Sequence, residues 1–112
     1  MTEIQKIIYE AEQNGKLFAK AESERIYLEE FKKSLLAILM KEYEQKGFTT
    51  VAAQEREARA NEKYIDVLKG LAEATKNAME LKFKLKVSEW KVMLHQTKQA
   101  DRRAEMKLVN AQ

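Results

Sequence analysis

Apolar residues recur every three or four positions along most of the chain, which is the period of an α-helix. Over about residues 3–46 they form one stripe: Ile4, Ile7, Ile8, Ala11, Leu17, Ala21, Leu28, Phe31, Leu35 and Ile38, widened by Leu36, Leu39, Met40 and Tyr43. So wide a stripe predicts burial against more than one neighbour. Asn14 and Gly15 interrupt the pattern, and we expect a kink or a frayed break there.

The first predicted helix ends at a clear stop signal. Gly47 suits the left-handed position after a helix, and Phe48 supplies the apolar contact that often follows it. Thr49 or Thr50 can cap the next helix with its side-chain oxygen. These features predict a tight turn over 47–50, a short helix over about 51–60, and antiparallel helices on either side of the turn.

A second long helix is predicted over about 61–108, with Asn61 as its capping residue. Tyr64, Leu68, Leu71, Thr75 and Ala78 recur along it at helical spacing. Gly70 lies inside this pattern, where a glycine costs about 1 kcal/mol relative to alanine. We therefore expect Gly70 to permit a close contact between helices.

Residues 81–87 alternate strictly between apolar and basic side chains, which is a strand signature. Leucine and lysine favour helix, however, no turn residue flanks the run, and an isolated strand is unstable. We therefore predict helix here. On that helix Phe83, Val87, Trp90 and Leu94 form one stripe, with Leu81, Leu85 and Val92 beside it.

Together these elements predict an all-α fold, a single helical domain over 1–112. Its architecture is a long antiparallel helical hairpin with a short intervening helix. A hairpin alone buries only one face of each helix, and the apolar stripes are wider than one such face. We therefore expect a homodimer, in which two hairpins form a helical bundle of the coiled-coil type.

The composition excludes several classes of functional site. Among 112 residues there is no cysteine, no proline, one histidine and three glycines, which excludes disulfides, thiolate zinc sites and glycine-rich phosphate loops. His95 is expected at the surface or rim, and the acids are interpreted as structural. We expect no catalytic residue, no metal and no cofactor, and predict that the protein is not an enzyme.

No membrane span or secretory signal is predicted. The longest apolar run, Leu35–Met40, is far shorter than the roughly 20 residues that a membrane helix needs. The first residues lack a basic flank followed by a long apolar segment. A cytoplasmic protein without a membrane partner is therefore expected.

Positive charge gathers toward the end of the chain. Residues 79–112 hold 8 basic and 4 acidic groups, whereas residues 1–46 hold 8 and 9. The candidate binding residues on this helix are Lys82, Lys84, Lys86, Trp90, Lys91, Lys98, Arg102 and Arg103, with Phe83 as a second ring. Positive charge beside stackable rings can bind single-stranded nucleic acid or a protein partner. In the other interpretation, Phe83 and Trp90 are core residues and the lysines form a solvated face.

Three short segments carry a resemblance to a family: Tyr27–Lys32, Thr50–Ala60, and Glu89–Lys91 followed by Arg102 and Arg103. Over about residues 16–105 the chain resembles small helical bacteriophage and prophage proteins, often encoded near recombination genes. That resemblance implies a phage context and bacterial host cytoplasm, and it implies no catalytic residue. The resulting expectation is a phage-derived adaptor that binds another protein, in recombination or in modulation of a host factor. The alternative is a weak nucleic-acid-binding protein that uses the basic-aromatic helix.

Overall fold

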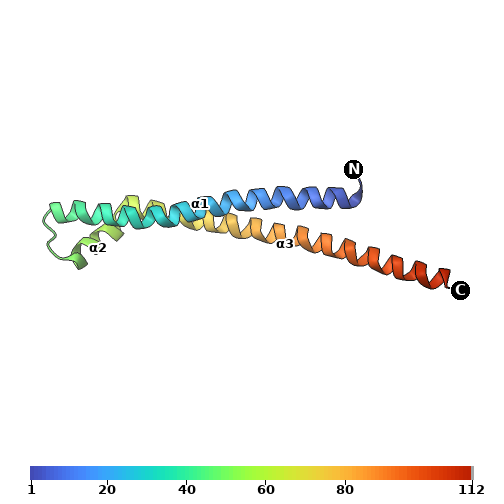
Figure 1. Cartoon of the computed structure of the whole chain (residues 1–112). Helices are drawn as coiled ribbons and strands as arrows, with labels where there is room; N and C mark the ends of the chain where they lie inside the picture. Colours follow the sequence, from blue (N-terminus) through green and yellow to red (C-terminus); the bar gives the residue numbers. More distant parts are fainter. Residues whose placement is uncertain (112) are drawn as a thin grey trace. The chain divides into compact units, whose positions relative to one another are not determined.

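The computed structural model describes residues 1–111 and contains three α-helices. Helix α1 spans Glu3–Gln45, α2 spans Val51–Ala60, and α3 spans Glu62–Asn110. The long helix α1 packs against α3 as a hairpin, with α2 inserted after the turn (Figure 1). The all-α hairpin predicted from the sequence is confirmed, and residues 81–87 are helical as expected.

The turn after α1 is a Schellman motif. Gly47 adopts a φ of 105°, a conformation that favours glycine. The Phe48 backbone N–H donates to the Tyr43 carbonyl oxygen and the Gly47 N–H to that of Glu44, each at 3.1 Å. The Phe48 ring packs edge-on against Tyr43, with ring centroids 5.6 Å apart. These bonds satisfy carbonyls that the helix end would otherwise leave unpaired.

The starts of α2 and α3 are each capped by the side chain predicted for that role, and the end of α2 is closed by the Asn61 backbone N–H, which donates to the Ala58 carbonyl oxygen. The Ala53 N–H donates to Thr50 Oγ1 at 3.1 Å, and the Lys63 N–H donates to Asn61 Oδ1 at 2.9 Å. The Asn61 side-chain amide also donates to the Tyr43 hydroxyl at 3.1 Å. Asn61 thus starts α3 and ties the end of α2 to α1.

The contacts divide the chain into two compact units, which are described separately. The turn unit comprises Lys20–Met79, and the terminal unit comprises Met1–Ala19 with Glu80–Gln112. Within the turn unit, Leu39 (1% exposed), Ala58 and Tyr64 form the core, one from each helix. Leu35, Leu36, Met40 and Tyr43 pack around them. Here α1 is buried against two neighbours, as its wide stripe predicted.

Helix α1 continues without a break through Asn14 and Gly15, so the predicted interruption is wrong. Both residues lie on the side of α1 that meets α3 in the terminal unit. Asn14 hydrogen-bonds to Ser88, and the space beside Gly15 is limited by Leu85 Cδ1, 3.8 Å from where a Cβ would lie. Packing against α3 therefore overrides the weak helix propensity of this pair.

The expected close approach at Gly70 is also wrong, because a Cβ placed there meets no atom within 4 Å. Gly70→Ala should therefore raise the free energy of unfolding by about 0.5–1 kcal/mol, since alanine loses less backbone entropy in a helix. Urea denaturation followed by circular dichroism measures this change. A loss of stability in the variant would contradict it.

Across the described residues, no helix combines the length and apolarity that a membrane crossing requires. No group of three or more His, Cys, Asp or Glu side chains in that part of the chain is arranged to hold a metal ion.

Candidate partner-binding surface

In the terminal unit, α3 turns one row of side chains toward α1. This inner row consists of Leu81, Leu85, Ser88, Val92 and His95, at alternating spacings of four and three, the pattern of a coiled coil. Ser88 is 1% exposed, and its hydroxyl oxygen accepts a hydrogen bond from the Asn14 side-chain amide at 2.8 Å. The same hydroxyl donates to the Lys84 carbonyl oxygen at 3.2 Å. A satisfied polar pair therefore occupies the middle of this helix–helix contact.

Phe83 and Trp90 are not core residues, and that interpretation of the sequence is wrong. Phe83, Trp90 and Met93 are 57–62% exposed, and Leu94 of the predicted stripe is also exposed. At about 100° per residue, Phe83, Lys86, Trp90 and Met93 share one face of α3, roughly opposite the inner row. We call these four residues the outer row. The sequence correctly predicted the helical period of this segment, but the prediction of which face of the helix is buried was wrong.

The two rings of the outer row, which lie about two helical turns apart in the sequence, contact each other. Phe83 and Trp90 have centroids 6.4 Å apart and planes at 90°, an edge-to-face arrangement. This contact holds the rings together as one apolar projection. Phe83 also lines a shallow hollow with Glu10 and Asn14 of α1, but both rings stay more than half exposed, so the projection is available to another molecule.

All eight candidate binding residues are exposed, but they do not form one surface. Lys82 and Lys86 lie on the same side of α3 as Phe83, whereas Lys84, Lys91 and Lys98 follow a separate line at seven-residue spacing. Arg102 extends that line by one turn. Arg103 lies on neither side, since it is rotated by about 100° from Arg102. The predicted set therefore splits into an aromatic surface with two lysines and a separate basic line.

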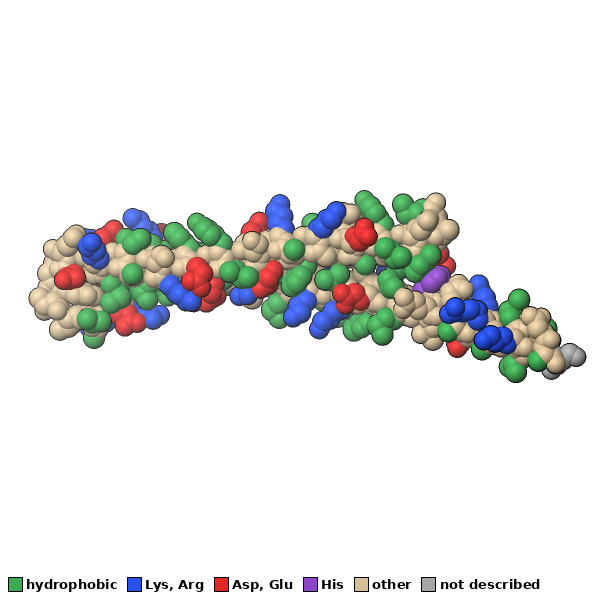
Figure 2. Space-filling view, in the orientation of Figure 1, with side chains coloured by type: hydrophobic (Ala, Val, Ile, Leu, Met, Phe, Trp, Pro, Cys, Tyr) green, Lys and Arg blue, Asp and Glu red, His purple; other side chains and the backbone are tan. Residues whose placement is uncertain are grey.

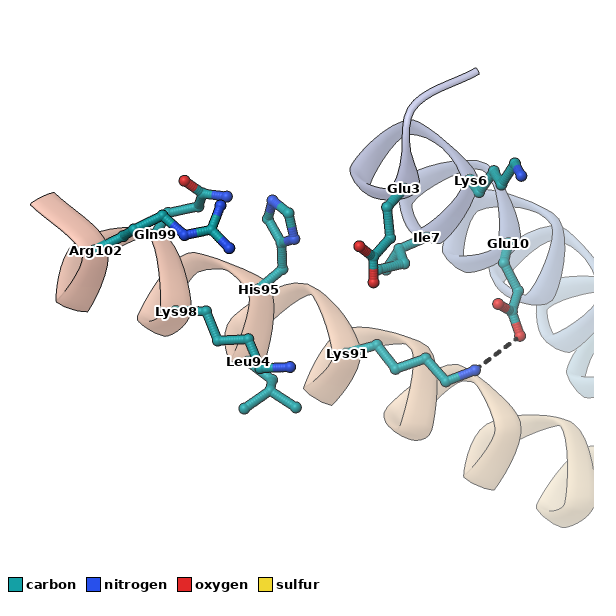
Figure 3. A pocket seen from close by; sticks show the side chains of 10 residues that line it. All are labelled: Glu3, Lys6, Ile7, Glu10, Lys91, Leu94, His95, Lys98, Gln99 and Arg102. Carbon is teal, nitrogen blue, oxygen red and sulfur yellow. Dashed lines mark ion pairs between the residues drawn. The ribbon is translucent and has the colours of Figure 1, made fainter.

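The basic line borders an open groove of about 540 Å³ between the two helices of the terminal unit (Figure 3). Lys91, Lys98, Arg102, His95, Leu94 and Gln99 line it from α3, and Glu3, Lys6, Ile7 and Glu10 line it from α1. Lys91 Nζ lies 3.5 Å from Glu10 Oε1, and the Glu3 carboxylate faces α3 across the groove. These α1 acids partly neutralise the basic line.

The sequence did not reveal the part that α1 plays at this site. Glu3 and Glu10 belong to a separate predicted helix, and nothing local marks them as neighbours of Lys91 or Lys98. Antiparallel pairing brings the start of α1 beside the latter part of α3. Beyond the groove α3 continues past the beginning of α1, and residues 96–111 are all exposed (Figure 1).

The arrangement offers binding surfaces made of exposed apolar groups and cations. Among the described residues, both arginines whose pKa is shifted lie in the turn unit. A hydrogen bond to Glu22 raises the pKa of Arg25, and one to Glu55 raises that of Arg59. Both shifts stabilise a charge that the side chain already carries. No protein-family model matches the chain, and comparison with curated proteins and with solved structures gave no match either.

Proposed function

We propose that the protein is a non-enzymatic adaptor that binds another protein through the outer row of α3. The observation that carries this proposal is the exposure of Phe83, Trp90 and Met93 at coiled-coil spacing on a face turned away from α1. Large exposed aromatic and methionine side chains are the groups most enriched at protein interfaces. Figure 2 shows that apolar side chains also alternate with charged ones along the visible surface.

The charges beside the outer row define the chemistry of the partner. Lys86 lies within the row and Lys82 beside it, with Glu89 as a neighbouring acid. A partner helix with apolar residues at three- and four-residue spacing and acids along its flank would match both features. We propose such an acidic amphipathic helix as the bound segment. The proposed setting is the phage context implied by the sequence resemblance, in recombination or host-factor modulation.

The geometry of the rings favours protein over nucleic acid at this surface. Bases stack on the open faces of aromatic rings. In the edge-to-face pair of Phe83 and Trp90, one ring points its edge at the face of the other, which removes one stacking platform. An apolar projection of this shape fits between the side chains of a facing helix.

Nucleic acid remains the second candidate, and the basic line supports it. In the described part of the chain, Lys84, Lys98 and Arg102 are exposed and form no ion pair. Such cations can bind phosphates in a sequence-independent, salt-dependent manner. The two candidates use different side chains, so variants can separate them.

Affinity capture from bacterial lysate tests the function. Phe83→Ala/Trp90→Ala should reduce recovery of a specific protein at least about tenfold, because buried aromatic anchors dominate interface energies. Recovery should survive nuclease treatment, and cross-linking should place an acidic helical segment of the captured protein on α3.

Tyr9→Ala provides the matched control, since Tyr9 is also an exposed aromatic residue of the terminal unit. Its capture should equal that of the wild type. Full recovery by the double variant would contradict the adaptor proposal. Capture that is lost on nuclease treatment and in Lys84→Glu/Lys98→Glu would establish the nucleic-acid alternative instead.

A further inference from the structure

A second exposed apolar row lies on α1 in the turn unit. Tyr27 and Ile38 are 66% and 54% exposed, and Phe31 lies between them. The Tyr27 and Phe31 rings are stacked, with centroids 6.1 Å apart and planes at 13°. The space between Phe31 and Ile38 on this face is occupied by the small residue Ser34.

This row belongs to neither of the faces that α1 buries in the turn unit. At about 100° per residue, it is rotated by roughly 90° from Leu28, Leu35 and Leu39, the side of α1 that carries the buried Leu39. Leu36 and Met40, which pack against the core cluster of Leu39, Ala58 and Tyr64, lie on the far side of the helix from it. Tyr27, Phe31 and Ile38 accordingly remain 66%, 38% and 54% exposed.

The ends of the row carry opposite charges. Glu24 precedes Tyr27 by three residues and Lys41 follows Ile38 by three, so the row from Glu24 to Lys41 keeps alternating spacings of three and four. Both charged side chains are exposed, and neither forms an ion pair within residues 1–111.

We propose that two copies of this chain pair through this row, with their α1 helices antiparallel. In a single register, Glu24 meets Lys41 of the second copy, Tyr27 meets its Ile38, and Phe31 meets its Ser34. Two-fold symmetry repeats each of these contacts. A parallel pairing would instead place Glu24 against Glu24 and Lys41 against Lys41, which like-charge repulsion disfavours.

The local shape agrees with this register. A shallow hollow on the surface of α1 is lined by Ser23, Glu24, Tyr27 and Leu28. In the antiparallel pair, Ile38 of the second copy arrives at this hollow as a knob enters a hole in a coiled coil. Ser34 leaves room for the Phe31 ring of the second copy. The pairing would cover all three large apolar side chains of the row.

Reciprocal charge reversal tests the register directly. Glu24→Lys places two lysines together at both ends of the pair, and Lys41→Glu places two glutamates there. Each variant alone should raise the dimer dissociation constant by about tenfold or more. Mixing the two variants should restore dimerisation, because in the mixed dimer every charge again meets its opposite. Sedimentation velocity gives the affinities, and native mass spectrometry identifies the mixed dimer.

Several controls separate this proposal from its alternatives. Glu73→Lys makes the same charge change at an exposed site of α3 and should leave the dimer unchanged. Circular dichroism should show equal helix content in all variants. A wild type that is monomeric at tens of micromolar, or a mixture of the two variants that stays monomeric, would overturn the proposal. So would loss of the dimer in Phe83→Ala/Trp90→Ala, which would place the second copy on the outer row instead.

Discussion

Leu39→Ala should lower the free energy of unfolding by about 3 kcal/mol, the largest effect expected from one substitution in this chain. Leu39 is 1% exposed and belongs to the cluster that joins all three helices through Ala58 and Tyr64. Removing its branched end loses the transfer free energy of the deleted carbons and leaves a cavity. Because α2 is short, moving it into that space would strain the hydrogen bonds at its two ends, from the Ala53 N–H to Thr50 Oγ1 and from the Asn61 N–H to the Ala58 carbonyl oxygen.

Urea denaturation at one fixed protein concentration measures this loss, since the dimer that we propose would make the stability depend on concentration. Leu17→Ala is the matched control, because Leu17 lies on the same helix but is 50% exposed. It should change the free energy of unfolding by less than about 0.5 kcal/mol. Equal losses in the two variants would show that Leu39 is not a core residue.

Ser88→Ala should lower the free energy of unfolding by about 1–2 kcal/mol, although it removes only one oxygen atom. The Ser88 hydroxyl accepts the hydrogen bond from the Asn14 amide, and Ser88 is buried between α1 and α3. Without that acceptor, the amide loses its partner inside the helix–helix contact. The cost is the desolvation of a polar group that remains unpaired.

Replacing both partners should recover most of this loss. In Asn14→Leu/Ser88→Ala the polar pair becomes apolar, so no donor is left unpaired and the double variant should approach wild-type stability. Thr97→Ala is the matched control: the Thr97 hydroxyl makes the same kind of bond to a backbone carbonyl oxygen, that of Met93, but is exposed. Its effect should be below about 0.5 kcal/mol. Additive losses in the double variant would contradict the pairing of Asn14 with Ser88.

The sequence alone determined the elements and the turn, because these depend on neighbouring residues. The predicted helices over about 3–46, 51–60 and 61–108 correspond to Glu3–Gln45, Val51–Ala60 and Glu62–Asn110. Gly47 could be recognised because a left-handed position after a helix favours glycine. Thr50 and Asn61 could be recognised because their side chains satisfy free N–H groups at helix starts.

Only the tertiary structure decided which face of each helix is buried. Along α3 two rows repeat with the same three- and four-residue spacing on opposite sides. The outer row, with Phe83 and Trp90, looks more like a core in the sequence than the inner row, which includes Ser88. Ser88 can be buried in the inner row because α1 brings Asn14 opposite it and supplies a hydrogen bond to its hydroxyl oxygen. Helical periodicity is a local property of the sequence, but which of two faces is buried depends on the helix that packs against it. Because α1 packs against the inner row, the aromatic residues of the outer row remain exposed and form the candidate site.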